Sequence, residues 1–204
     1  MKSAAKKHSA FPKKQKNVVV IGVCGAAGSF SEEAAKIYVQ KQNIQNADFR
    51  YLVTAEAVFS ALSKREVTIA VVPVANSIGG IVRESLLAGA KYTYVVQEVF
   101  SIQIHQNILV KKGTTPGAIK QIVSHEQAIK QCRGYLKRVW PKVKVGEYPD
   151  TAKAAKDLAE GALPASTGVI ASRAAAKLYK LDILGASIQD DKHNVTTFIA
   201  AMAA

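Results

Sequence analysis

Two adjacent threonines near the end of the chain, Thr196 and Thr197, are the residues whose types and spacing most directly suggest chemistry. They follow Asn194 and precede Phe198 in the segment HNVTTFIAAMA, residues 193–203. Thr is favoured in strands by propensity alone, so the last strand of a β-sheet is one interpretation. A proton-donating hydroxyl is the other. A free hydroxyl is a poor acid, so such a donor would need neighbours that stabilise its alkoxide.

A glycine-containing loop near the start of the chain, VCGAAGSFSEEAA, is a second candidate. Its Gly22, Gly25 and Gly28 match neither the dinucleotide pattern G-x-G-x-x-G nor a phosphate-binding P-loop. Ser29 and Glu32 have capping-box spacing, which predicts a helix start whose free N–H groups can hold an anion. A plain glycine turn with a cap is the alternative.

Three further segments place polar side chains where a strand leads into a helix. They carry these side chains in pairs: Asn76 and Ser77, Ser124 and His125, and Asp150 and Thr151. Taken singly, each pair is explained as a helix cap or turn. Taken together, these helix starts and the threonine segment would line one cleft with neutral donors, which suits an oxygen-rich anion.

Composition narrows the function classes. The 204 residues have a formal net charge of +13, and residues 1–16 contribute six Lys and no acid. The remainder has 22 basic and 15 acidic residues, a net +7 that favours a small anionic ligand. A nucleic-acid platform is not expected, because no basic run is interleaved with aromatic residues. We expect residues 1–16 to form a basic disordered tail.

Cysteine, histidine and apolar patterns exclude other classes. Cys24 and Cys132 form no C-x-x-C pair, which predicts reduced thiols in a cytoplasmic protein. The four His have no ligand spacing, so no metal is expected. No apolar run approaches the ~20 residues of a membrane span, so no membrane association is expected.

The elements that must position these side chains alternate between strand-length apolar runs and helical patterns. The expected strands cover 17–24, 49–53, 68–74, 92–99, 101–111, 121–125, 142–148, 167–172, 182–190 and 196–201. The expected helices cover 31–42, 55–64, 80–89, 116–121, 125–138, 150–160 and 172–179. This alternation predicts an α/β fold with mainly parallel sheets covered by helices on both faces, in two lobes facing across a cleft. Ligands of such sheets bind at the carboxyl ends of the strands.

In this order, the motifs resemble the catalytic domain of prephenate dehydratases and the related plant arogenate dehydratases. GAAGSFSEEAA resembles G-P-x-G-[ST]-[FY]-S, VPVANSIGGIV resembles V-P-I-E-N-S-x-x-G, and SHEQAIKQC resembles S-H-P-Q-A-x-x-Q-C. DTAKAA, VIASRAAAKLYKLDIL and IQDDKHNVTTF resemble D-T-A-x-A-A, A-I-A-S-x-x-A-A-x-x-Y-G-L-x-I-L and I-Q-D-x-x-x-N-x-T-R-F. The resemblance covers roughly residues 17–200 and implies a two-lobed architecture like that of type II periplasmic-binding proteins. Lobe 1 would comprise about 17–98 plus a returning C-terminal segment within 17–204, and lobe 2 about 99–184.

The resemblance implies a reaction. Prephenate loses CO2 and its ring hydroxyl to give phenylpyruvate in phenylalanine biosynthesis, and aromatisation drives the step without a cofactor. By the family motif Thr196 is the proton-donor candidate, and the substrate, prephenate or arogenate, is a small anion. The implied substrate-binding residues are Gly28, Ser29, Phe30, Asn76, Ser77, Ser124, Thr151, Asn194, Thr197 and Phe198.

Several positions depart from the family pattern. Ala75 and Thr197 stand where the family has Glu and Arg, Gln106 stands for the family's His, and Ala26 stands for a Pro. Two alternatives therefore stay open: a prephenate decarboxylase-like lyase, or a catalytically degenerate module that binds small carboxylates. This chain stops at Ala204, where typical members continue into an ACT regulatory domain that senses phenylalanine. We therefore expect no feedback inhibition by phenylalanine. A homodimer stays open as well.

Overall fold

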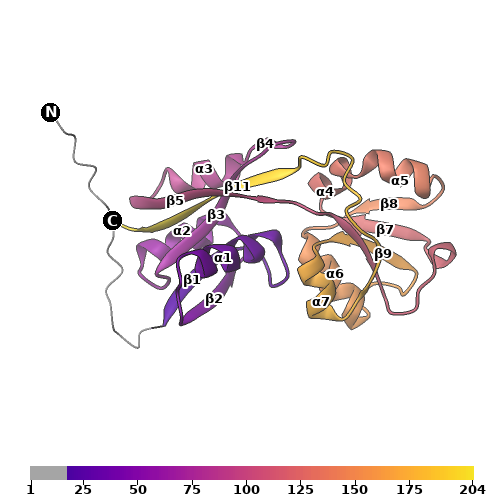
Figure 1. The fold of residues 1–204 in the computed structure, drawn as a ribbon, viewed down its shortest axis with the longest axis horizontal. Coiled ribbons are helices and arrows are strands. Elements are labelled where there is room, and N and C mark those ends of the chain that lie inside the picture. Colours follow the sequence, from indigo (N-terminus) through magenta and orange to yellow (C-terminus); the bar gives the residue numbers. More distant parts are fainter. Residues whose placement is uncertain (1–17) are drawn as a thin grey trace.

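Two β-sheets, each covered by helices on both faces, form two lobes joined by extended segments (Figure 1). The computed structural model describes residues 18–204. The basic tail expected over residues 1–16 therefore lies outside the described residues.

The first sheet contains both ends of the described chain. Its strands in spatial order are β2 (Ala47–Leu52), β1 (Val19–Cys24), β3 (Ile69–Asn76), β11 (Val195–Ala203) and β5 (Tyr94–Gln103), and β4 (Gly80–Ile81) pairs with β3. β1 is parallel to β2 and β3, whereas β11 is antiparallel to both β3 and β5. The C-terminal strand thus lies inside this sheet, next to strands made much earlier in the chain.

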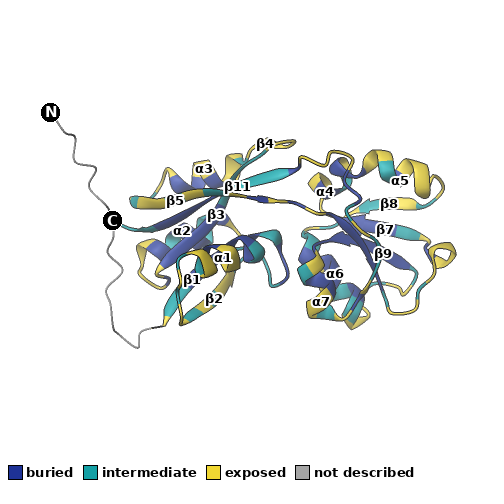
Figure 2. Cartoon of the chain, viewed as in Figure 1, coloured by how far each residue is buried: buried dark blue, intermediate teal, exposed yellow. Residues whose placement is uncertain are grey.

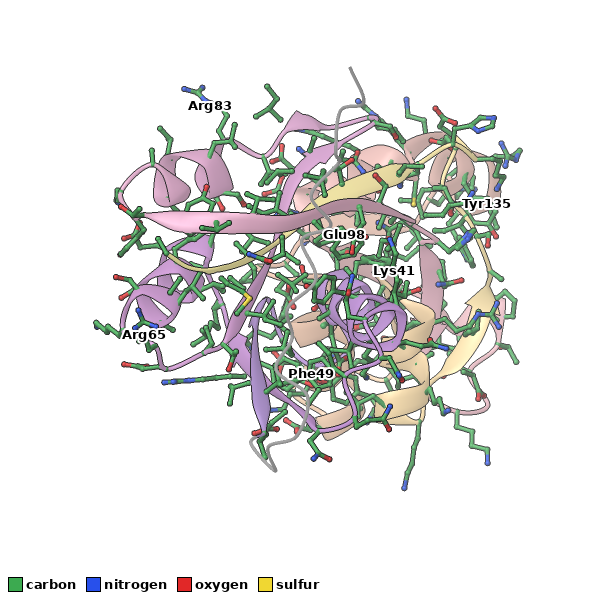
Figure 3. All side chains as sticks on the ribbon, turned by 60° about the vertical axis from the view of Figure 1, so that its left-hand side comes forward. Lys41, Phe49, Arg65, Arg83, Glu98 and Tyr135 are labelled. Atoms are coloured by element: carbon green, nitrogen blue, oxygen red, sulfur yellow. The ribbon has the colours of Figure 1, made fainter. Side chains whose placement is uncertain are left out.

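Helices cover both faces of the first sheet, which explains its nearly continuous apolar strands. They are α1 (Phe30–Lys41) on one face and α2 (Ala55–Ser63) and α3 (Arg83–Gly89) on the other. The helix expected over 80–89 begins later, because Gly80 turns the chain at φ 74° and pairs in β4. Lys41 of α1 forms an ion pair with Glu98 of β5, which joins the helix to the edge strand (Figure 3).

The second sheet carries the rest of the chain. Its strands in spatial order are β10 (Asp182–Gly185), β6 (Asn107–Val110), β9 (Thr167–Ala171), β7 (Gln121–Ser124) and β8 (Lys144–Glu147). Its helices are α4 (Glu126–Gln131) and α5 (Arg133–Val139) on one face and α6 (Thr151–Glu160) and α7 (Arg173–Tyr179) on the other, with a short 3-10 helix η1 (Pro116–Ala118).

Two predicted helices of this lobe differ in the structure. The helix expected over 125–138 is interrupted at Cys132, whose backbone has φ −115° and ψ 9°. Asp190, remote in sequence, accepts hydrogen bonds from the backbone N–H groups of Gly134 and Tyr135 at 2.7 and 2.8 Å and so caps α5 independently. The helix expected over 116–121 is only the short turn η1.

The predicted two-lobed α/β fold is confirmed, but both sheets are mixed rather than mainly parallel. The strands that enter a lobe from the other one, β11 and β6, run antiparallel to their neighbours. β5 belongs to the first sheet along its whole length, so the chain first changes lobes after Gln103, beyond the boundary expected near residue 98. The buried residues gather on the central strands of both sheets (Figure 2). Within residues 18–204, no helix has both the length and the apolar character needed to cross a membrane.

Candidate functional site

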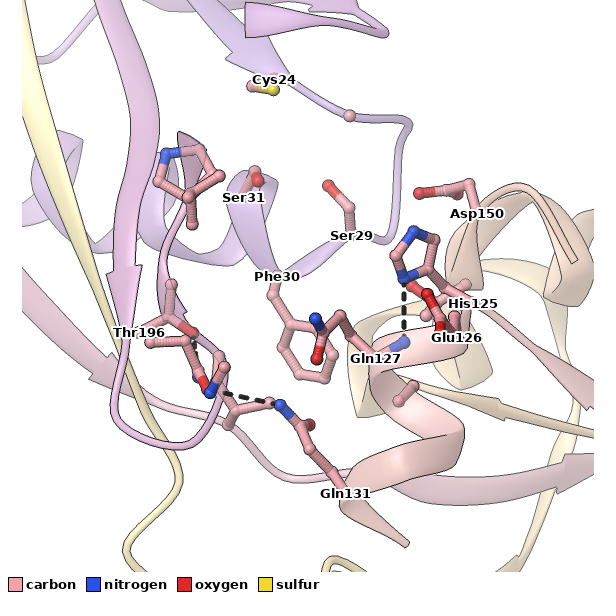
Figure 4. A pocket seen from close by; sticks show the side chains of 18 of the residues that line it. Cys24, Ser29, Phe30, Ser31, His125, Glu126, Gln127, Gln131, Asp150 and Thr196 are labelled. Atoms are coloured by element: carbon pink, nitrogen blue, oxygen red, sulfur yellow. Dashed lines mark hydrogen bonds between the residues drawn. The ribbon is translucent and has the colours of Figure 1, made fainter. Parts of the chain in front are cut away.

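The main cavity lies between the two lobes and has a volume of about 630 Å³. The first lobe contributes the starts of α1 and α3, the end of β3 and the start of β11. The second lobe contributes α4 and the start of α6. Polar side chains from both lobes line it, among them Ser29, Thr196, Gln127 and Gln131 (Figure 4). Asn76 and Thr151 line it as well. A ligand here would contact both lobes at once.

The Thr196 hydroxyl is held by a side-chain amide of the adjacent strand. Thr196 of β11 lies opposite Asn76 of β3 in the antiparallel register, and Asn76 Nδ2 donates to Thr196 Oγ1 at 2.9 Å. The same nitrogen lies 2.8 Å from Asn194 Oδ1 and 3.1 Å from the carbonyl oxygen of Val195. Because Thr196 Oγ1 accepts from Asn76, its own proton is free to be donated elsewhere.

Neutral amides extend this network into the second lobe. Asn194 Nδ2 donates to Gln131 Oε1 at 2.8 Å, and Gln106 Nε2 donates to the same oxygen at 3.0 Å. Gln131 Nε2 lies 3.5 Å from Asn76 Oδ1, which completes a link between α4 and the Asn76–Thr196 pair. Gln106 is 4% exposed, and its Oε1 has no hydrogen-bond partner among the described residues. The proton-donor candidate is therefore embedded in a network without charged members.

Thr197 and Ala75 face away from the cavity. They are cross-strand partners in the register of β11 and β3, and the Thr197 hydroxyl is 2.9 Å from Ser101 Oγ of β5. Successive residues of a strand point to opposite faces, so Thr196 and Thr197 cannot serve the same site. Two of the four departures from the family motifs, Ala75 and Thr197, are thus direct neighbours on the outer face of the sheet.

Helix starts supply the anion-binding potential of the cavity. Ser29 Oγ accepts from the N–H of Glu32 at 3.2 Å and caps α1, which has 12 residues. Asp150 caps α6 through the N–H of Lys153 at 2.7 Å, and His125 Nδ1 caps α4. The first N–H groups of a helix have no partner within it, so α1 in particular presents donors to an anion at the cavity wall.

Acidic residues outnumber basic ones around the cavity. Glu84, Glu126 and Asp150 line it, whereas Arg83 is the one Lys or Arg among the lining residues, and its side chain extends outward from the ribbon (Figure 3). Burial, together with the charges of Glu84 and Asp150, raises the pKa of the Cys24 thiol to about 11. Cys24 is therefore a thiol at neutral pH, which makes it a poor nucleophile. Among residues 18–204, no group of His, Cys, Asp and Glu is arranged to hold a metal ion.

The loop before α1 is fixed by a buried carboxylate. Glu32 accepts hydrogen bonds from the Gly28 N–H and the Tyr51 hydroxyl, each at 2.6 Å, and forms an ion pair with Lys36 at 2.7 Å. Burial opposes ionisation, but the hydrogen bonds from Lys36, Tyr51 and Gly28 hold the pKa of Glu32 below its ordinary value. Gly28 itself has φ 83°, and an added Cβ would lie 3.0 Å from the backbone of Ala175. Gly28 thus sets a close contact between the lobes.

Of the residues predicted to bind substrate or donate the proton, five line the cavity: Ser29, Phe30, Asn76, Thr151 and Thr196. The others, which are not among its lining residues, are Gly28, Ser77, Ser124, Asn194, Thr197 and Phe198. Asn194 is fully buried one layer behind Asn76. Phe198 is core, stacked against Phe100 at 6.1 Å between ring centroids.

The two serines of the predicted set hold backbone instead of facing the cavity. Ser77 Oγ donates to the carbonyl of His193 and accepts from the N–H of Val195, both at 2.9 Å. The fully buried Ser124 donates to the carbonyl of Ile170 at 2.6 Å. Their hydroxyls stabilise the approach to β11 and the β7–β9 pair.

Gln127 and Gln131 were not predicted as site residues, although both lie within the segment SHEQAIKQC. Their spacing of four residues places them on one face of a helix, which is the signal that could have found them. Figure 4 shows both on α4, across the cavity from Thr196.

The fold and the inter-lobe cavity define a class: a two-lobed α/β protein with the type II periplasmic-binding-protein architecture and a cavity between the lobes. Within it, the family model described as prephenate dehydratase matches residues 21–203. The chain belongs to the prephenate dehydratase family, as the six sequence motifs predicted.

Individual relatives agree with this assignment. The chain is 36% identical over 177 residues to arogenate dehydratase 5 of Arabidopsis thaliana, covering 86% of this chain and 40% of that protein. It is 35% identical over 176 residues to the prephenate dehydratase of Methanocaldococcus jannaschii, covering 84% and 60%. The crystal structure of prephenate dehydratase from Arthrobacter aurescens, in complex with L-Phe, matches with a TM-score of 0.83 at 24% identity, covering 91% and 60%. The chain thus spans between 40% and 60% of the length of these curated relatives.

Proposed function

We propose that this chain catalyses the decarboxylating dehydration of prephenate to phenylpyruvate, a carbon–oxygen lyase reaction of phenylalanine biosynthesis. One observation carries the proposal: the hydroxyl-bearing side chain at the family's proton-donor position, Thr196, lines the inter-lobe cavity while it accepts a hydrogen bond from Asn76. Arogenate, which differs from prephenate in its side chain, undergoes the same ring chemistry and is the second substrate to be tested.

The proton transfer involves the Thr196 hydroxyl, the ring hydroxyl of the substrate and Asn76 Nδ2. The Thr196 hydroxyl gives its proton to the ring hydroxyl of the substrate, whose C–O bond breaks as water leaves. The electrons of the breaking bond to the ring carboxylate enter the ring, and CO2 departs as the ring becomes aromatic. Asn76 Nδ2, 2.9 Å from Thr196 Oγ1, stabilises the alkoxide until a proton from solvent restores it.

Binding of the substrate carboxylates rests on backbone donors. The start of α1 offers the N–H groups of Phe30 and Ser31, since the Ser29 N–H already donates to the Ala26 carbonyl, whereas Asp150 places its own carboxylate at the start of α6. We assign no Arg to a substrate carboxylate, because the position where the family has Arg is Thr197 here, and Thr197 lies on the outer face of the sheet beside Ser101. Expelling water by closing the lobes would strengthen the remaining hydrogen bonds.

Phenylpyruvate formation tests the proposal directly. Purified protein is mixed with prephenate, and product is followed by its absorbance in alkali. We expect Thr196→Ala to lower kcat by about 10²- to 10⁴-fold, the usual contribution of a general acid. Thr197→Ala is the matched control, because it removes the neighbouring hydroxyl on the outer face, and we expect it to retain the wild-type rate.

Two results would contradict the proposal. Wild-type protein that forms neither phenylpyruvate from prephenate above the acid-catalysed background nor phenylalanine from arogenate is not a dehydratase. Equal rates for Thr196→Ala and Thr197→Ala would remove Thr196 from the acid role. Mass spectrometry of the product identifies a decarboxylase instead, since its product keeps the hydroxyl that dehydration removes.

We further propose a cytoplasmic location and a homodimer. Cys24 and Cys132 are both free, which supports a reducing compartment. The edge strand β5 exposes Val96 and Val99 by 44% and 62%, and a second copy pairing there would cover them. A sedimentation mass equal to one chain at micromolar concentration would exclude the dimer.

A further inference from the structure

A second cavity of about 380 Å³ lies on the outer side of the second lobe, between the α4–α5 helices and strand β8. We call it the α5 groove. β8 lies at the edge of its sheet (Figure 1), where it pairs with β7 among the described strands. The groove is lined by β8 residues and so lies at this edge. Its volume falls within the roughly 300–1,000 Å³ of small-molecule sites. Of its lining residues only Glu126 also lines the inter-lobe cavity.

The walls of the α5 groove are apolar and include an aromatic ring. Ile129 and Leu136 come from the helices, Val145 from β8, and Trp140 from the turn between them. Tyr135 packs edge-on against Trp140 with ring centroids 6.0 Å apart, and this contact restrains the indole. A flat ring entering the groove would bury its surface against a fixed indole.

Two cations of the groove have no acidic partner. Lys130 forms an ion pair with Glu126, but Arg133 and Lys137 make no ion pair and no hydrogen bond among the described residues. Arg133 and Lys137 stand at the first and fifth positions of α5, so they lie on one face of the helix. Glu147, at the end of β8, is the groove's other unpaired charge. One end of the groove therefore favours an anion.

We propose that the α5 groove binds a small aromatic carboxylate, with its ring against Trp140 and its carboxylate on Arg133 and Lys137. Arg is suited to this role because its guanidinium donates two parallel hydrogen bonds to a carboxylate. The carboxylate of Glu147 opposes the ligand's charge, so the orientation that places the ligand's carboxylate at the α5 end is the favoured one.

The groove is connected to the inter-lobe cavity through α4. Ile129 lines the groove, and on the same helix Gln131 accepts from Asn194 at 2.8 Å and lies 3.5 Å from Asn76. A ligand that shifts α4 displaces Gln131 and, through these amides, the partner of Thr196. Occupancy of the groove therefore alters the rate of the dehydration. This second part rests on the proposed function; the binding itself does not.

The single tryptophan of the chain makes binding directly measurable. Trp140 fluorescence, excited at a wavelength the ligand does not absorb, is titrated with 3-phenylpropionate. We expect a saturable change, absent with acetate, which has no ring, and with benzyl alcohol, which has no charge. Arg133→Gln combined with Lys137→Gln should weaken binding by about tenfold or more, as expected for lost charge-assisted hydrogen bonds.

A matched control exists on the opposite face of the same sheet. Helix α7 has the same length as α5 and carries Arg173 and Lys177 at the same first and fifth positions. Arg173→Gln combined with Lys177→Gln removes the same charges far from the groove, and we expect unchanged binding. Glu147→Gln should tighten binding, because it removes the opposing charge.

The outcomes separate the two parts. Absence of a saturable fluorescence change, or equal weakening by the α5 and α7 double variants, overturns the groove as a binding site whether or not the protein is a dehydratase. If prephenate turnover is present, 3-phenylpropionate should change its rate in the wild type and in the α7 variant. An equal change in rate for the α5 double variant would mean that 3-phenylpropionate acts at the inter-lobe cavity, and it would overturn the proposed coupling between the α5 groove and that cavity.

Discussion

Asn76→Asp is the most specific perturbation of the site, because it keeps the accepting oxygen Oδ1 and replaces the donating Nδ2 by a second accepting oxygen. Asn76 Oδ1 accepts from the N–H groups of Ile78 and Gly79 at 3.0 and 2.8 Å, and a carboxylate keeps both bonds. Asn76 Nδ2 faces three oxygens, those of Thr196, Asn194 and Val195. The variant therefore preserves the turn after β3 while it places an acceptor against acceptors.

The magnitude follows from the bonds that are lost. Nδ2 has two hydrogens, so two hydrogen bonds disappear, at about 0.5–1.5 kcal/mol each, and we expect a loss of about 1–3 kcal/mol in unfolding free energy. The Thr196 hydroxyl can hydrogen-bond to the new carboxylate only as the donor. Its proton is then no longer available to a substrate in the cavity. We therefore expect kcat to fall by about 10²- to 10⁴-fold, the full contribution of a general acid.

Urea unfolding and prephenate turnover measure the two effects. Asn46→Asp is the control, because it introduces the same charge at an exposed position outside the cavity. The stability difference between the two variants should shrink as pH falls, since a protonated carboxyl regains a donor. Equal stability and equal kcat for the two variants at pH 7 would refute the role of Asn76 in holding Thr196.

Three further perturbations test other parts of the structure. Glu32→Gln should lower the free energy of unfolding above about pH 4.5, because Glu32, with its depressed pKa, stabilises the fold only where its carboxylate is ionised. This effect should disappear on acidification, and a difference in urea midpoint that does not depend on pH would contradict it. Ala75→Glu and Thr197→Arg together should show a favourable coupling of about 0.2–1 kcal/mol in a double-mutant cycle of unfolding free energy, because the two positions are cross-strand partners. The double variant should keep the wild-type kcat, and a changed kcat would place these residues in the site. Asp190→Ala should destabilise by about 0.5–2 kcal/mol through loss of the α5 cap, visible as a lower urea midpoint, and a wild-type midpoint would show that α5 needs no cap from outside.

The sequence predicted the elements that depend on local patterns. Ser29 and Asp150 were expected at helix starts and cap α1 and α6, because their preference is set by the chain next to them. Sheet order and strand direction are set by tertiary pairing, so the insertion of β11 between β3 and β5 was not visible. The break at Cys132 likewise depends on Asp190, which caps α5 from a distant part of the chain.

The site was predictable where the family motif and strand geometry agree. Thr196 and Asn76 were both predicted and lie opposite each other at the cavity. Ser77 and Ser124 are also polar residues at the ends of strands, yet their hydroxyls bond to backbone carbonyls. Residue type cannot distinguish a hydroxyl facing a cavity from one that satisfies a buried backbone group. Thr197 was predicted to bind substrate but is not among the lining residues of the cavity. Alternation along a strand places Thr196 and Thr197 on opposite faces, but it does not tell which of these faces meets the cavity.

The position of β11 also bears on how the chain folds during synthesis. β5 has β11 as its only neighbour in the sheet, so it has no strand partner until residues 195–203 have been made. The second lobe, by contrast, contains only residues between β6 and β10 and can form its sheet as soon as they have emerged from the ribosome. The order of folding is therefore inverted relative to the order of synthesis: the lobe that begins the chain is the last to be completed. Until then the edges of β3 and β5 are open to pairing with strands of other chains.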